Sequence, residues 1–330
     1  MQILLPERTY RRVASELAAI APKASFVLLH DDGVFTCDGD VIDPMEAPIE
    51  IAWSSRDLYI LEEQAAIRAF MVAVLKSQSV RWLHSGGAGL DHPVFGMISK
   101  KGVRLTNSDS GAIAMAEYVL GCVLDVYQPN ATRHQLQNDR QWKASPFREV
   151  AGTTWLIVGL GAIGREVAVR ATAFGASVIG MRRNPRGDEP VAEMIAPDQL
   201  IATLPRADVV VLCATLNDST RLLVNAEFLL ALKSQAVLVN VARGGMLDEL
   251  ALLASLESGR PAVAILDVFE TEPLPEDSGL WRHPSVRMTA HCSASGSGTS
   301  HRSDAGFLSN LERYVAGEAL NMEVGPSEIG

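Results

Sequence analysis

Three side chains with complementary chemistry follow predicted strands in the second half of the sequence. Arg243 lies in NVARGG, Glu272 in DVFETEP and His291 in MTAHCSASG, each after an apolar run typical of a strand. In doubly wound parallel sheets, ligands bind beyond the carboxyl ends of the strands, so we expect the three to converge at one rim. Each residue alone is more often structural. Their combination is what indicates a site.

An arginine, a carboxylate and a histidine are the parts needed to reduce a 2-keto acid by hydride transfer. The forming alkoxide needs a proton donor, and histidine is the usual choice because this side chain titrates near neutral pH. A neighbouring carboxylate, here Glu272, would hold the ring of His291 in place. The planar guanidinium of Arg243 can engage the carboxylate of the substrate with two donors.

The hydride carrier is predicted to bind at residues 154–183, TWLIVGLGAIGREVAVRATAFGASVIGMRR. This segment predicts a strand, a glycine-rich turn, a helix ending near Gly175 and a second strand. The G-x-G-x-x-G pattern at the turn would place free backbone N–H groups and the helix dipole against a dinucleotide pyrophosphate. A glycine-rich turn of an ordinary doubly wound sheet is the alternative. The predicted cofactor-binding residues of the turn are Gly159, Gly161, Ala162, Ile163 and Gly164.

The end of the second strand favours NADP(H), with NAD(H) as the alternative cofactor. An NAD site uses an Asp or Glu there to accept from the ribose hydroxyls. This chain instead has Arg182 and Arg183, which can neutralise a 2′-phosphate. Asp188 and Glu189 are expected to lie too far along the chain to serve the ribose. A solvated basic turn is the less favoured explanation of the two arginines.

Apolar runs alternate along the chain with segments of helical spacing, which predicts two doubly wound parallel-sheet domains of the α/β class. Strands are expected at 1–5, 25–30, 49–54, 80–84, 103–106, 155–158, 177–181, 208–213, 236–241, 262–266 and 286–289. Helices are expected at 8–20, 61–75, 111–127, 197–204, 225–232, 248–258 and 299–316. Residues 129–147 are polar and predict a loop or short helix. The helix at 111–127 is apolar on most faces, which fits either a buried helix or a subunit interface.

The composition of the 330 residues argues against several classes of binding partner. A formal net charge of −10 argues against nucleic acid and anionic membranes. No apolar run approaches the roughly eighteen residues of a membrane span, and the first residues do not resemble a signal peptide. Four scattered cysteines without a C-x-x-C pair fit reduced thiols rather than a zinc site. We therefore expect a cytoplasmic protein with a small-molecule substrate and no metal.

Several blocks of the sequence resemble the D-isomer-specific 2-hydroxyacid dehydrogenases, a family that includes glyoxylate/hydroxypyruvate reductases and phosphoglycerate dehydrogenases. The resemblance runs along nearly the whole chain from about Arg81. It rests on SGGAGLDH, RLTNSDSGAIAMAEYVL, GLGAIGREVA, LNDSTRLL, LVNVARGGMLDE, AILDVFETEPLP, LWRHPSVRMTAH and NLERYVAGEAL. Alanine stands at 290 and threonine at 215, where the family usually has proline, and Cys292-Ser293 replaces glycine-rich residues; these differences concern the local backbone.

The resemblance implies a role for each site residue. Arg243 would bind the substrate and polarise its carbonyl, His291 would be the acid/base, and Glu272 its partner. Asp267 and the backbone at Val241 would hold the nicotinamide carboxamide. The backbone N–H groups of Ala88 and Gly89 would hold the substrate carboxylate, as amides facing an anion.

The resemblance also implies the domain organisation. A flavodoxin-like substrate domain would comprise residues 1–106 and 292–330, with a Rossmann-type nucleotide domain, 107–291, inserted in it and the active site in the cleft. We expect Trp53 to face that cleft from the first domain. A homodimer is implied as well.

The function expected from these residues is NAD(P)H-dependent reduction of a small 2-keto acid such as glyoxylate or hydroxypyruvate. The predicted active-site segments show no extra charge for a second anionic group, which disfavours phosphoglycerate. The alternative is a non-catalytic, dimeric, nucleotide-sensing protein on the same fold.

Overall fold

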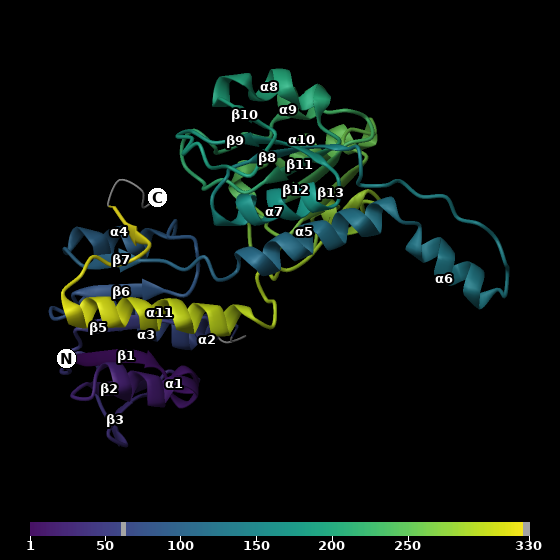
Figure 1. The fold of residues 1–330 in the computed structure, drawn as a ribbon. Coiled ribbons are helices and arrows are strands. Elements are labelled where there is room, and N and C mark those ends of the chain that lie inside the picture. The colour runs from purple at the N-terminus through teal and green to yellow at the C-terminus, as the bar shows by residue number, and fades with distance from the viewer. Residues whose placement is uncertain (61–63, 326–330) are drawn as a thin grey trace. The chain divides into compact units, whose positions relative to one another are not determined.

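The chain divides into two compact units in a computed structural model that describes residues 1–60 and 64–325 (Figure 1). Unit 1 comprises Met1–Gly111 and Ser297–Gly330, and unit 2 comprises Ala112–Gly296. Each unit has one sheet of its own. No helix among the described residues is long and apolar enough to cross a membrane.

The sheet of unit 1 has a parallel centre with antiparallel edges. Its spatial order is β15-β7-β6-β5-β1-β2-β3-β4. The five parallel strands, taken in chain order, lie 2-1-3-4-5, which is the flavodoxin-type order. The strands are β1 (Gln2–Pro6), β2 (Ser25–Leu29), β3 (Phe35–Cys37), β4 (Asp40–Val41), β5 (Ile51–Ser54), β6 (Trp82–Ser85), β7 (Arg104–Thr106) and β15 (Glu323–Val324).

The helices of unit 1 are α1 (Glu7–Ile20), α2 (Asp57–Ile60), α3 (Gln64–Lys76), α4 (Pro93–Lys100) and α11 (Thr299–Ala316). Helix α4 was not predicted. Pro93 begins it, and the ring of His92 caps it by accepting from the Val94 amide at 3.2 Å. The predicted helix 61–75 begins within residues 61–63, which lie outside the described part of the chain.

The core of unit 1 corrects one prediction. Alternate residues of β5 point to opposite faces of the sheet, so Ala52 and Trp53 fall in separate apolar clusters. Trp53 is fully buried and stacks on Phe307 of α11, with ring centroids 3.9 Å apart. The expectation that Trp53 faces the active site is therefore wrong, because α11 covers it.

The sheet of unit 2 is wholly parallel among the described strands. The spatial order is β10-β9-β8-β11-β12-β13-β14, which is 3-2-1-4-5-6-7 in chain order and extends the Rossmann arrangement by one strand. The strands are β8 (Thr154–Val158), β9 (Ser177–Met181), β10 (Glu193–Ile195), β11 (Val209–Leu212), β12 (Val237–Asn240), β13 (Val263–Leu266) and β14 (Val286–Met288).

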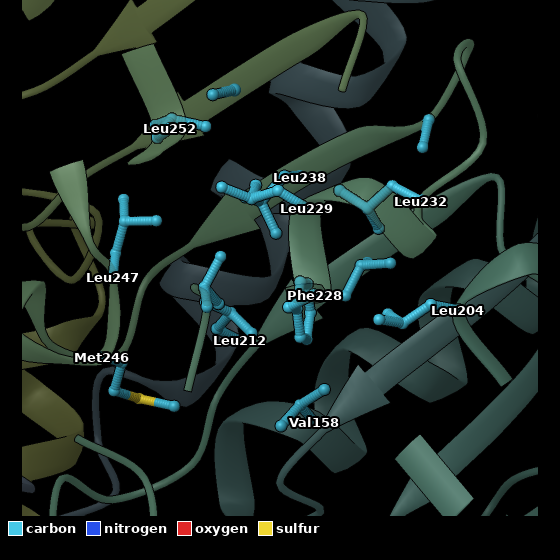
Figure 2. Close-up of a cluster of buried hydrophobic side chains, with 14 of the residues drawn as sticks. Val158, Leu204, Leu212, Phe228, Leu229, Leu232, Leu238, Met246, Leu247 and Leu252 are labelled. Carbon is cyan, nitrogen blue, oxygen red and sulfur yellow. The ribbon is translucent and has the colours of Figure 1, made fainter. Parts of the chain in front are cut away.

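Both faces of this sheet are covered by helices, as an unbroken apolar strand requires. On one face α5 packs against α7 over Trp155, so the apolar surface of α5 is used largely within the chain. Figure 2 shows the other face, where Val158 and Leu212 lie with Phe228 of α9. The helices of unit 2 are α5 (Ala112–Tyr127), α6 (Asn130–Asn138), α7 (Ala162–Ala173), α8 (Leu200–Thr203), α9 (Ala226–Ala231) and α10 (Glu249–Glu257).

One segment of unit 2 projects from its core. Helix α6 has no buried residue, and it extends away from the sheet of unit 2 in Figure 1. The stretch that follows it, 139–149, is exposed along most of its length. Trp142 in this stretch is fully exposed, at 104% of its reference surface. We call residues 130–149 the arm.

Candidate active site

The glycine-rich turn between β8 and α7 has the shape of a phosphate cradle. Gly159 has a φ of +102°, and a Cβ there would lie 2.5 Å from the amide nitrogen of Ala214. A Cβ on Gly164 would lie 2.0 Å from the carbonyl oxygen of Gly159. At Gly161, in contrast, a Cβ would meet nothing within 4 Å. The turn therefore needs glycine at two positions for packing, and leaves open space at the third.

The amino end of α7 faces that space with unsatisfied donors. Gly161 is the N-cap residue and supplies no side-chain acceptor, and the helix begins at Ala162 with Ile163 and Gly164 next. The first backbone N–H groups of a helix have no partner within it, and the helix dipole adds positive potential there. The residues present thus fit the pyrophosphate of a dinucleotide.

Both predicted arginines lie at the carboxyl end of β9, but their surroundings differ. The Nη1 of Arg182 donates to the carbonyl of Leu160 at 3.3 Å. The same nitrogen lies 3.8 Å from the carboxylate of Glu189. Arg183 is exposed, and its Nη2 donates to Ser219 Oγ at 2.9 Å. Ser219 was not predicted, and nothing in its sequence context distinguishes it from other loop serines.

Glu189 returns toward Arg182 because the intervening residues form a tight loop. Its carboxylate accepts from the amides of Arg186 and Gly187, at 2.6 and 2.8 Å. These hydrogen bonds hold the pKa of Glu189 below its usual value. Asp188 pairs instead with Arg165 of α7. The acidic residues of this loop therefore stabilise the loop and the arginines beside it.

His291 and Glu272 form a hydrogen-bonded pair. The His291 Nδ1 lies 2.8 Å from the Glu272 Oε2, and the Phe269 amide donates to the other carboxylate oxygen at 2.9 Å. Burial raises the pKa of Glu272. The bonds from His291 and Phe269, with the charge of Arg243, outweigh that effect and leave the pKa below its usual value. Glu272 therefore carries a negative charge beside the imidazole at neutral pH.

Arg243 is held close to this pair by the turn after β12. The Asn240 side chain donates to the Arg243 carbonyl at 3.0 Å and accepts from the Ala242 amide at 3.0 Å. A Cβ on Gly244 would lie 1.8 Å from the Phe269 carbonyl carbon, so the turn and the 269–272 segment are in direct backbone contact. The structure thus brings together the arginine, carboxylate and histidine that the sequence predicts.

Asp267 is buried and its carboxylate is fully hydrogen-bonded within unit 2. It accepts from the Thr289 hydroxyl at 2.6 Å, from the Cys292 amide at 2.9 Å, and from both the amide and the hydroxyl of Ser293. Thr289 in turn bonds Tyr118 of α5, with 2.8 Å between the two oxygens. Sequence reasoning missed Tyr118, Thr289 and Ser293, since a tyrosine on an apolar helix and hydroxyls in a loop carry no distinctive pattern.

Three further predicted binding residues are divided between the two units. Val241 is buried directly after β12, and its amide donates to the Leu212 carbonyl at 3.4 Å. Ala88 and Gly89 belong to unit 1, in the loop after β6. The Asn107 side chain donates to the Ala88 carbonyl at 2.6 Å, which orients that peptide.

Among the described residues, no cluster of three or more His, Cys, Asp or Glu side chains could hold a metal ion.

Comparison with known sequences identifies the chain's relatives. Residues 120–293 match the family described as D-isomer specific 2-hydroxyacid dehydrogenase, NAD binding domain. The chain is 30% identical to a D-3-phosphoglycerate dehydrogenase from Methanocaldococcus jannaschii, over 84% of this chain and 55% of that protein. It is 32% identical to a glyoxylate/hydroxypyruvate reductase A from Salmonella paratyphi B, over 68% and 74%. The chain thus spans about half the length of the curated phosphoglycerate dehydrogenases that it matches.

Solved structures agree with the sequence relatives. A D-isomer specific 2-hydroxyacid dehydrogenase family protein from Aeromonas salmonicida matches with a TM-score of 0.79 at 27% identity, covering 98% of each chain. An NADPH-dependent glyoxylate/hydroxypyruvate reductase from Sinorhizobium meliloti matches with a TM-score of 0.75 at 26% identity, covering 100% of this chain and 99% of that one. This chain therefore belongs to the D-isomer specific 2-hydroxyacid dehydrogenase family.

Proposed function

We propose that the protein is a reductase of small 2-keto acids, such as glyoxylate or hydroxypyruvate, with NADPH as its preferred cofactor. The observation that carries this proposal is the His291–Glu272 pair beside Arg243, in the same unit as a glycine turn that fits a dinucleotide. The glyoxylate/hydroxypyruvate reductases among its relatives support the substrate class.

A bound nicotinamide would supply the hydride that reaches the carbonyl carbon, while the carbonyl π electrons move to oxygen. His291 gives the proton that this oxygen needs, from Nε2, because Nδ1 is engaged by Glu272. The charge of Glu272 stabilises the protonated ring before the transfer. Arg243 binds the substrate carboxylate and stabilises the developing negative charge on oxygen. We assign the backbone amides of Ala88 and Gly89 to the same carboxylate.

The resemblance to the family assigns Asp267 and the Val241 backbone to the nicotinamide carboxamide. The geometry favours a further role for Asp267, because the hydrogen-bond donors to its carboxylate in the described part of the chain all come from residues 289–293. We infer that Asp267 positions the loop that carries His291.

Arg182 and Arg183 support NADPH over NADH, because two guanidinium groups at the end of β9 can bind a 2′-phosphate. Relatives from Xanthobacter autotrophicus and Sinorhizobium meliloti were solved with NADPH and NADP. The test is the ratio of kcat/KM for the two cofactors. We expect at least about tenfold preference for NADPH, lost in the Arg182→Asp, Arg183→Ser double variant. Equal use of both cofactors, or an unchanged preference in the variant, would overturn this assignment.

We propose that the protein is a homodimer in which a second copy of the chain packs against the arm. An exposed tryptophan on a projecting segment is the kind of residue that anchors interfaces. Sedimentation equilibrium should give the mass of a dimer, and Trp142→Ser should shift the protein toward monomer. A monomeric wild-type protein would contradict the proposal.

All four cysteines are free, which supports a reducing, cytoplasmic location.

Reduction is tested by absorbance at 340 nm with NADPH and a panel of 2-keto acids. We expect turnover of glyoxylate or hydroxypyruvate, and loss of at least about a hundredfold in His291→Ala. Tight NADPH binding without turnover of any 2-keto acid would instead identify a nucleotide-sensing protein. Full activity in His291→Ala would disprove the assigned proton donor.

A further inference from the structure

Tyr118 on α5 is joined by hydrogen bonds to the loop that carries His291. Its hydroxyl oxygen lies 2.8 Å from Thr289 Oγ1. Thr289 donates its one hydroxyl hydrogen to the Asp267 carboxylate, at 2.6 Å. The hydrogen between Tyr118 and Thr289 must therefore come from Tyr118. The bonds run in one direction, from the phenol through the threonine to a fully buried carboxylate.

The surroundings of Tyr118 keep it in this donor role. Burial raises the pKa of the phenol, and the negative charge of Asp267 adds to that effect, although the bond to Thr289 acts against it. The hydroxyl therefore keeps its proton at neutral pH. The side chain also packs against the apolar cluster between α5 and the sheet of unit 2, to which the buried Val119 of the same helix belongs. The helix thus holds the donor in a fixed place.

The loop around His291 is held on both sides through Asp267. Thr289 lies two residues before His291 and Ser293 lies two residues after it, and both donate their hydroxyls to the Asp267 carboxylate. Of these two hydroxyls, that of Thr289 is the one tied to α5, through Tyr118. Without the phenol, the Thr289 oxygen loses the donor that fixes its orientation, and the loop on that side of His291 is held less firmly.

We propose that Tyr118 is a positioning residue for proton transfer, which directs the hydroxyl of Thr289 onto Asp267 and so holds the loop that presents His291. This inference rests on the proposed function, in which His291 gives the proton to the carbonyl oxygen of the substrate. Tyr118 acts through Thr289 and Asp267, so it is not itself the proton donor to the substrate.

A second tyrosine on the same helix provides a matched control. The hydroxyl of Tyr127 is also buried, but it has no hydrogen-bond partner among the described residues. The ring of Tyr127 lies instead against the guanidinium of Arg148, with 4.6 Å from the ring centroid to Cζ. Removing this hydroxyl takes away no hydrogen bond, and a buried polar group without a partner is unfavourable in the folded state.

The first experiment compares Tyr118→Phe with Tyr127→Phe in NADPH oxidation, using the 2-keto acid that the wild type reduces most efficiently. We expect kcat of Tyr118→Phe to fall about 3- to 10-fold, the rate equivalent of one net hydrogen bond. The KM values for NADPH and the 2-keto acid should stay within about twofold, because binding groups are not removed. Tyr127→Phe should keep the wild-type kcat. A wild-type kcat in Tyr118→Phe would overturn the inference.

The second experiment separates positioning of His291 from a general effect on the fold. In a His291→Ala background, Tyr118→Phe should change kcat by less than about twofold, because the group that it positions is absent. Thr289→Val should lose at least as much activity as Tyr118→Phe, and the Tyr118→Phe, Thr289→Val double variant should lose no more than Thr289→Val alone. The same factor for Tyr118→Phe with and without His291, or additive losses with Thr289→Val, would overturn the inference.

The outcomes also separate this inference from the proposed function. We expect the melting temperature of Tyr118→Phe to lie only about 2–4 °C below that of the wild type, so that its loss of activity is not caused by unfolding. Turnover by the wild type with an unchanged Tyr118→Phe would overturn the positioning role and leave the reductase intact. No turnover of any 2-keto acid by the wild type would overturn the reductase, and this inference with it.

Discussion

The carboxylate of Asp267 accepts hydrogen bonds from both the amide and the hydroxyl of Ser293, two residues beyond His291. The His291 amide donates to the Asp267 carbonyl at 2.8 Å, and His291 has a φ of +50°. A non-glycine residue in the left-handed region is strained, and it persists only where its surroundings hold it there. The hydrogen bonds between Asp267 and the loop 289–293 supply that restraint, at the residue assigned to proton transfer.

Asp267→Asn should destabilise unit 2 and misplace His291. An amide presents one oxygen instead of two and turns an NH2 toward the donors that face it. We expect a loss of about 2–4 kcal/mol in the free energy of unfolding, with a fall in kcat of at least tenfold. Ser293→Ala, which removes only one donor, should cost about 1 kcal/mol. Denaturant unfolding and NADPH oxidation measure the two effects, and a neutral Asp267→Asn would refute the positioning role.

Glu272→Gln should lower activity without unfolding the protein. The glutamine keeps a side chain of similar size but removes the charge beside His291 Nδ1. We expect kcat/KM to fall about a hundredfold, with a changed pH profile, while the melting temperature moves little. Glu270→Gln, at a neighbouring exposed position, is the matched control and should be active. Equal activity of the two variants would remove Glu272 from the mechanism.

The glycine turn makes opposite predictions for two of its members. Gly164→Ala should destabilise unit 2, because its Cβ would clash with the Gly159 carbonyl. Gly161→Ala should fold normally, since its Cβ enters open space, yet bind NADPH at least tenfold more weakly by blocking phosphate approach. Melting temperature and NADPH fluorescence titration separate stability from binding. Normal NADPH binding by Gly161→Ala would place the pyrophosphate elsewhere.

His84 should make the stability of unit 1 sensitive to acid. The ring is buried, its Nδ1 bonds Thr106 Oγ1 at 2.8 Å, and burial lowers its pKa to about 3. In the unfolded chain the His84 ring takes up a proton near pH 6.5, whereas in the folded chain it does so only near pH 3. Between these two pH values the unfolded state therefore binds more protons than the folded state. Stability is therefore complete above about pH 6.5 and falls on acidification, by up to about 1.4 kcal/mol per pH unit.

His84→Phe tests this by removing the titrating group while keeping an aromatic ring. The wild type should lose more stability than the variant between pH 6.5 and pH 3, as measured by urea midpoints across that range. His301→Gln, at an exposed position, should behave like the wild type. Parallel pH curves for His84→Phe and the wild type would contradict the prediction.

Local patterns predicted the parts of the molecule that depend on nearby residues. The turn from Gly159 to Gly164 and the strands that flank it follow from spacing and apolar runs, and so does the convergence of Arg243, Glu272 and His291. The short strands β3, β4, β10 and β15, which lie at or next to a sheet edge, were missed, because two or three residues in a strand produce no periodicity.

Features that depend on distant partners could not be predicted in this way. Trp53 was misplaced because its partner, Phe307, lies 254 positions along the chain on α11. The hydroxyls that satisfy Asp267 become its partners only when separate segments are brought together. Side-chain type is visible in a sequence, but burial and pairing are properties of the fold.

The stacking of Phe307 on Trp53 has a consequence for synthesis on the ribosome. Unit 2 is continuous, whereas unit 1 receives α11 and β15 only after unit 2 has been translated. Until then, the nascent first segment has no ring to cover Trp53 and Trp82, which both stack on Phe307 in the finished fold. Long-range contacts of this kind slow folding and leave apolar surface open to aggregation. The interval before α11 is translated is therefore the stage of synthesis at which this chain most needs protection from aggregation.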